Sequence, residues 1–213
     1  MTAIRIPVFA TALVASALGC SRSPPSPSPH PATPAAAAPA AAPGRTSPST
    51  LRVESPPRDA LSSVGDPVPT FHAVASNGQP VDIAPGARAH ALVVYFYPRD
   101  ETPGCTIEAE AFRDAHDVYE TSGIDVVGVS TDDDAAHRGF TSNHSLQFPL
   151  VADPEGRVAA AFGVRVNNGY AQRTTFVVDR QGHVARVFSP VQPRGHADEV
   201  IAAVRALGPS ASL

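Results

Sequence analysis

Cys105 stands at a position where a cysteine thiol can be reactive. A run of Val and aromatic residues predicts a buried strand over residues 89–97, and helix-forming residues follow over 103–119. Thr102 suits the N-cap and Pro103 the first helical position, so Cys105 falls in the first helical turn. The free N–H groups and the positive end of the helix dipole stabilise an anion there, which predicts a thiolate. A buried, unreactive thiol is the alternative.

The residue types present in the chain, and their spacing, exclude several other chemistries. Thr102 and Glu108 occupy the two positions where a C-x-x-C motif would carry its second thiol, so no dithiol couple is present. All 16 basic residues are Arg, which excludes Schiff-base chemistry and a lysine phosphate loop. The consecutive acids Asp132–Asp134 lack the spacing of a calcium loop and indicate a helix start, and the His residues lack metal-site spacing. We therefore expect no metal and no cofactor.

The remaining pattern alternates strands with helices and predicts one α/β domain over residues 61–209. A central mixed sheet flanked by helices is expected, with an N-terminal β-hairpin around Asn77-Gly78. Eleven Arg against eighteen acidic residues give residues 61–213 a balance of −7, which argues against nucleic acid as a partner. The predicted strands are 68–74, 80–83, 124–129, 148–151, 173–178 and 184–188, and the predicted helices are 132–143, 155–162 and 197–207.

The first residues have the pattern of an export signal. One positive charge precedes an apolar run over 6–18, which is too short to span a bilayer as a mature helix. The run ends in Ala-Leu-Gly before Cys20, which resembles the lipobox of bacterial lipoproteins. That resemblance implies a signal peptide over 1–19, lipidation of Cys20 and, because Ser21 follows, a periplasm-facing place at the outer membrane. An ordinary secretory signal or a buried N-terminal helix is the alternative.

A tether is predicted between this signal and the domain. Residues 21–60 contain eleven Pro, nine Ala and seven Ser, with no apolar periodicity. Such a segment buries too little surface to offset its chain entropy, so we expect disorder over 20–60. A short tail is expected over 210–213. In this arrangement the protein contacts the membrane through its lipid anchor only.

The segment around Cys105 resembles the active-site signature of the peroxiredoxins, Pro98-x-x-x-Thr102-x-x-Cys105. The closer resemblance is to the bacterioferritin comigratory protein (PrxQ-like) subfamily, and it extends in order from about Ser63 to Leu207. It implies a thioredoxin-like fold and thiol-dependent reduction of hydrogen peroxide and organic hydroperoxides, without a cofactor. The segments that carry it are YFYP at 95–98, TPGCT-x-E at 102–108, FRD at 112–114, GVSTD at 128–132, FPL-x-x-D at 148–153, FGV at 162–164 and RTTFVVD at 173–179.

The resemblance implies a role for each matching residue. Cys105 corresponds to the peroxidatic nucleophile, which becomes a sulfenic acid. Thr102 would bind the thiolate and the peroxide through its hydroxyl, Arg173 would stabilise the thiolate and the leaving oxygen, and Pro98 would shield the thiolate from solvent. Without the resemblance, Thr102 reads as a helix cap and Arg173 as a paired strand residue.

One departure from the subfamily concerns the resolving cysteine. Most recognisable relatives carry it five residues after the nucleophile, where this chain has Glu110. Lipidation would remove the Cys20 thiol, so we expect a one-Cys enzyme, a monomer, whose sulfenic acid is reduced by an external thiol. Pairing with another chain is the alternative. A thioredoxin-like protein or a small thiol is the expected reductant. The alternative is a non-enzymatic redox sensor or binding module of the cell envelope.

Overall fold

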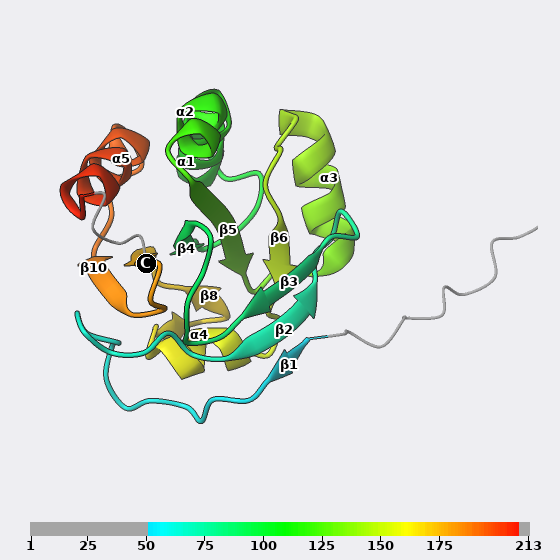
Figure 1. Cartoon of the computed structure of the whole chain (residues 1–213). Helices are drawn as coiled ribbons and strands as arrows, with labels where there is room; N and C mark the ends of the chain where they lie inside the picture. Colours follow the sequence, from blue (N-terminus) through cyan, green and yellow to red (C-terminus); the bar gives the residue numbers. More distant parts are fainter. Residues whose placement is uncertain (1–50, 209–213) are drawn as a thin grey trace, which may run out of the picture. The chain divides into compact units, whose positions relative to one another are not determined.

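The computed structural model describes residues 51–208, which fold around a five-stranded mixed sheet (Figure 1). Parallel pairing joins β4 (Ala91–Phe96), β5 (Ile124–Ser130) and β6 (Leu150–Ala152). On the other side of β4 lies β9 (Thr174–Val178), which pairs antiparallel with β4 and with β10 (Val184–Phe188). These strands are rich in β-branched residues and are buried along most of their length, as expected for a covered sheet. From one edge of the sheet to the other, the strand order is β10-β9-β4-β5-β6.

Helices cover both faces of this sheet because alternate residues of its strands enter two separate cores. In β4, Val93 and Tyr95 enter one core, whereas Val94 and Phe96 enter the other. The first core is closed by four helices, and the second by one short helix and a small antiparallel sheet. The four helices are α1 (Pro103–Asp114), α2 (His116–Thr121), α3 (Asp134–His144) and α5 (His196–Ala206), and the short helix is α4 (Arg157–Phe162).

The small sheet contains the predicted hairpin and one strand that the sequence analysis missed. The hairpin strands β2 (Phe71–Val74) and β3 (Pro80–Ile83) pair antiparallel across the Asn-Gly turn. On the other side of β2 lies β1 (Arg52–Val53). The overall architecture is therefore the predicted one, a central mixed sheet with flanking helices and an N-terminal hairpin.

The predicted boundary between tether and domain is corrected by this strand. Residues 51–60, assigned to the tether, lie against the domain. Leu51 is buried in the second core, and the Arg58 N–H donates to the Ala160 carbonyl at 2.8 Å. At Gly163 a Cβ atom would lie 2.0 Å from the Ala60 carbonyl oxygen, so only glycine allows the chain to pass there. The sequence analysis missed this segment because a two-residue strand that is held by backbone hydrogen bonds produces no periodic pattern of apolar residues in the sequence.

Two further local features differ from the sequence prediction. The helix expected over 103–119 is interrupted at Ala115 and continues as α2. A hairpin of β7 (Val166–Asn167) and β8 (Tyr170–Ala171) was not predicted, although its turn has a recognisable sequence. Asn168 and Gly169 have φ angles of 51° and 80°, which is the Asn-Gly type I′ turn.

Several sequence predictions lie outside the described residues. These are the signal peptide over 1–19, the lipidation of Cys20, the tether over 20–50 and the tail over 210–213. Between residues 51 and 208, no helix has the length and apolarity needed to cross a membrane.

Candidate active site

Cys105 lies where the sequence predicted it, in the first turn of α1 beyond the carboxyl end of β4. The helix begins at Pro103, so Cys105 is its third residue, and the side chain is buried with 1% exposure. The expected cap by Thr102 is wrong in one respect, because its hydroxyl makes no capping bond to α1. It donates instead to the Arg99 carbonyl at 3.0 Å. The oxygen therefore keeps its lone pairs for another donor.

Arg173 reaches this cysteine from a different part of the chain. Antiparallel pairing of β9 with β4 aligns Thr174 with Phe96, so Arg173 sits just beyond the end of β4. Its Nη2 donates to the Cys105 Sγ at 3.1 Å. The structure thus brings together two residues that the sequence analysis assigned to one site, 68 positions apart. The guanidinium thus places a hydrogen-bond donor and a fixed positive charge beside the sulfur.

Glu108 is the site residue that sequence reasoning missed. Its side chain is fully buried and forms an ion pair with Arg173 Nη1, while its second oxygen has no hydrogen-bond partner among the described residues. Burial raises the pKa of this carboxyl to about 7, against the opposing effect of the Arg173 charge. The usable signal is spacing, because Cys105 and Glu108 are three apart and share one face of α1.

Two further positions singled out in the sequence, Pro98 and Glu110, flank Cys105 along the chain. Pro98 follows β4 by two residues and is half-buried at the start of the loop that leads to α1. Glu110, in place of the resolving cysteine, faces α3, where its carboxylate contacts His144 Nδ1 at 3.2 Å and Arg113 at 3.4 Å. Among the described residues Cys105 is the one free cysteine.

His144 connects α3 to residues that precede and follow Cys105 in the chain. Besides Glu110 it contacts the Glu101 carboxylate at 3.1 Å through Nε2. Burial alone lowers the pKa of the imidazole, but the hydrogen bonds to Glu101 and Glu110 outweigh it, and the pKa is raised. The ring therefore links the loop before α1, and α1 itself, to the end of α3.

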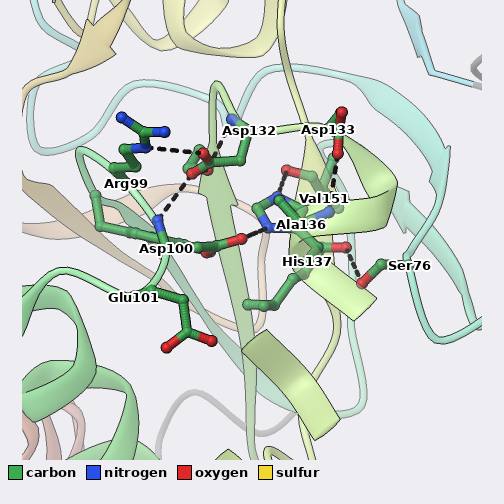
Figure 2. Close-up of polar contacts among 12 residues, drawn as sticks. Ser76, Arg99, Asp100, Glu101, Asp132, Asp133, Ala136, His137 and Val151 are labelled. Carbon is green, nitrogen blue, oxygen red and sulfur yellow. Dashed lines mark hydrogen bonds and ion pairs between the residues drawn. The ribbon is translucent and has the colours of Figure 1, made fainter. Parts of the chain in front are cut away.

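One group of side chains near the loop has the composition of a metal site. Asp100, Asp132 and His137 place ligand atoms within 4.8 Å of one another (Figure 2). These atoms are already hydrogen-bonded. Asp132 accepts from the Asp100 N–H at 2.9 Å and the Ser130 hydroxyl at 2.7 Å, and Asp100 faces His137 Nδ1 at 2.7 Å. Donors that point into the cluster suit a hydrogen-bond network and leave no free set of ligands for a cation.

Comparison with known proteins agrees with this geometry. The AhpC/TSA family profile matches residues 64–187. The chain is 36% identical over 145 residues to chloroplastic peroxiredoxin Q of Arabidopsis thaliana, covering 67% of each protein. It is 33% identical over 145 residues to a putative peroxiredoxin bcp of Coxiella burnetii, covering 65% of this chain and 95% of that one.

Solved structures show the same similarity. Peroxidoxin BcpB of Mycobacterium tuberculosis has a TM-score of 0.61 and 35% identity, over 68% of this chain and 98% of that chain. A mutant peroxiredoxin Q of Xanthomonas campestris has a TM-score of 0.61 and 31% identity, over 71% and 100%. These likenesses confirm the predicted thioredoxin-like fold.

A buried thiol in the first turn of a helix, on a thioredoxin-like sheet and in contact with an arginine, defines a thiol-based oxidoreductase. The family match makes the class specific. The chain belongs to the AhpC/TSA peroxiredoxins and is similar to their PrxQ and bacterioferritin comigratory members. It is a peroxiredoxin, a thiol-dependent hydroperoxide reductase.

Proposed function

We propose that this peroxiredoxin works through a single cysteine. The observation that carries the proposal is the 3.1 Å contact between Arg173 Nη2 and the Cys105 Sγ. The thiolate attacks one peroxide oxygen, so an S–O bond forms while the O–O bond breaks. Cysteine is oxidised to a sulfenic acid, and the leaving oxygen takes a proton and departs as water or an alcohol.

Each group around Sγ has a different role in this step. Arg173 stabilises the thiolate and the negative charge that develops on the leaving oxygen. The Thr102 hydroxyl, which donates to Arg99, has lone pairs available to accept the peroxide hydrogen. Pro98 limits access of solvent to the sulfur. Glu108 holds the guanidinium in place through its ion pair.

Regeneration requires a thiol from outside the domain. The carboxylate of Glu110 cannot form a disulfide, and Cys105 is the one cysteine of residues 51–208. A first external thiolate attacks the sulfenic sulfur and releases water, which leaves a mixed disulfide. A second external thiolate then attacks the external sulfur of this mixed disulfide. The two external sulfurs form a disulfide, and Cys105 leaves as the reduced thiolate. The names of the relatives support a peroxide as substrate, and a thioredoxin-type protein is the reductant expected from the family.

The first prediction tests the peroxide site directly. The full chain with Cys20→Ser, reduced and mixed with stoichiometric hydrogen peroxide, is expected to lose its Cys105 thiol orders of magnitude faster than free cysteine. Rapid-quench mass spectrometry follows the loss, and Cys105→Ser provides the blank. A rate equal to that of free cysteine would disprove the proposal. Fast oxidation without turnover, once thioredoxin or a small thiol is added, would favour the redox sensor.

The anchor and the location belong to the same proposal. The apolar run and Cys20 support export, lipidation and a place in the cell envelope, with the domain as a monomer on its tether. We expect Cys20→Ser to move the protein from the membrane pellet to the soluble fraction, because the lipid could no longer be attached. Fractionation of cells expressing either form measures this. Unchanged membrane association would contradict the lipoprotein assignment.

A further inference from the structure

The loop that connects β4 to α1 determines where the proposed catalytic groups stand. It carries Pro98 and ends at Thr102, three residues before Cys105. Its outer side borders a hollow of about 520 Å³ that is lined by the loop and by one face of α3. Glu101 has a φ angle of 59°, a conformation that few non-glycine residues adopt. Such a loop keeps its shape only if directed contacts hold it.

Asp100 provides those contacts from the middle of the loop. Its side chain is buried, and both carboxylate oxygens are engaged. One oxygen accepts from the Tyr97 hydroxyl at 2.8 Å, and the other lies 2.7 Å from His137 Nδ1. Its backbone N–H donates to Asp132 at 2.9 Å (Figure 2). The loop is thereby attached to the residue that follows β4, to the segment after β5, and to α3.

His137 is the member of this network that belongs to a rigid element far along the chain. It lies in α3, is fully buried, and its Nε2 contacts the Val151 carbonyl of β6 at 3.3 Å. The ring is therefore fixed on one side by the sheet and on the other by the loop. Among the described residues His137 has no hydrogen bond or ion pair with Cys105. Any effect on the sulfur therefore passes through Asp100, or through the Tyr97 hydroxyl, which lies 3.5 Å from His137 Nδ1 and donates to Asp100.

We propose that His137 is a positioning residue for peroxide reduction, holding the loop through Asp100 so that Pro98, Thr102 and the first turn of α1 enclose Cys105 correctly. This inference rests on the proposed roles of Cys105 and Thr102. The Thr102 hydroxyl is bonded to Arg99 at 3.0 Å, and the Thr102 carbonyl accepts the Thr106 N–H at 2.9 Å. A shift of Asp100 therefore moves both the hydroxyl and the helix start.

The position of Arg173 gives the proposal a distinctive signature. Arg173 precedes β9, outside the loop, and contacts Sγ independently of His137. Loss of the His137–Asp100 contact should therefore impair the peroxide geometry while leaving thiolate reactivity nearly intact. A residue that only stabilised the fold would alter both together.

The test compares two reactions of Cys105 in the full chain with Cys20→Ser. His137→Phe is expected to lower the rate with hydrogen peroxide at least about tenfold, since small misplacements of reacting groups are costly. Alkylation by iodoacetamide should stay within about twofold of the wild-type rate. His137→Asn, whose amide can replace Nδ1–H, should recover most of the peroxide rate.

A matched control is available at the opposite end of the sheet. His90 contacts Asp125 through Nδ1 at 3.0 Å, but this pair is exposed and lies at the amino ends of β4 and β5. His90→Asn is expected to leave both rates unchanged. The proposal is overturned if His137→Phe reacts with peroxide like the wild type, or if both rates change by the same factor.

Two safeguards keep the outcome interpretable. If His137→Phe does not fold, Asp100→Asn provides the same comparison, because it keeps the shape of the side chain but removes the carboxylate. A wild-type rate with Asp100→Asn would equally reject the proposal. The wild type is measured first. A slow reaction of the wild type with peroxide would count against the proposed function itself. If the wild type reacts fast, the rates of the variants decide whether His137 is a positioning residue.

Discussion

Arg173→Met is expected to slow the oxidation of Cys105 by hydrogen peroxide at least about a hundredfold. Removing one preorganised donor from a charge that develops in the transition state typically costs 10²–10³ in rate. Arg173 contacts Sγ at 3.1 Å with a side chain that is only 15% exposed, so water cannot replace it efficiently. Rapid-quench measurement of the thiol at several peroxide concentrations gives the second-order rate constant.

The same substitution has a second effect, on stability. It leaves the Glu108 carboxyl buried without its counter-charge, and breaking a buried ion pair on one side typically costs about 3–5 kcal/mol. Urea unfolding measures this loss. The double variant Arg173→Met, Glu108→Gln should recover much of the stability, because no buried charge remains, but none of the rate. Recovery of the rate would mean that Arg173 acts only by neutralising Glu108.

The sheet was predictable because its strands have an unambiguous pattern. β4, β5 and β9 are runs of Val with Ile, Leu or aromatic residues, long enough to show that they are buried on both faces. The segments that were missed are short and held by backbone pairing. β1 has two residues, and its assignment depends on the distant strand β2 rather than on local composition. The Asn168-Gly169 turn, in contrast, was readable from the sequence.

The site was predictable to the extent that it is encoded locally. The order of strand, loop and helix placed Cys105 correctly in the first turn, and the family resemblance identified Arg173. Local rules failed at Thr102, whose hydroxyl bonds to the loop instead of capping the helix. They failed also at Glu108 and His137, because the burial of an ionisable side chain is a property of the assembled fold. Both residues have partners that are distant in sequence, Arg173 and Asp100.

Glu108 is expected to make the stability of the protein fall as the pH rises from about 4.5 to about 7. The pKa of its carboxyl is about 7 in the folded protein, against 4.5 for the ordinary group. The folded state therefore binds the proton more tightly than the unfolded state, and the free energy of unfolding decreases with pH throughout this interval. A shift of this size corresponds to about 3 kcal/mol, present below the interval and lost above it.

Other groups titrate in the same range, so the measurement must be a difference. The raised pKa of His144 also removes stability as the pH increases, whereas the lowered pKa of the buried His196 imidazole removes stability as the pH decreases. Urea unfolding of the wild type and of Glu108→Gln, at matched pH values, cancels both contributions. The wild type should lose about 3 kcal/mol more than the variant between the acidic and the neutral end. Parallel pH profiles would show that the carboxylate stays ionised throughout. Its charge would then be stabilised by Arg173 alone, and the guanidinium would be held beside Cys105 at every pH of the interval.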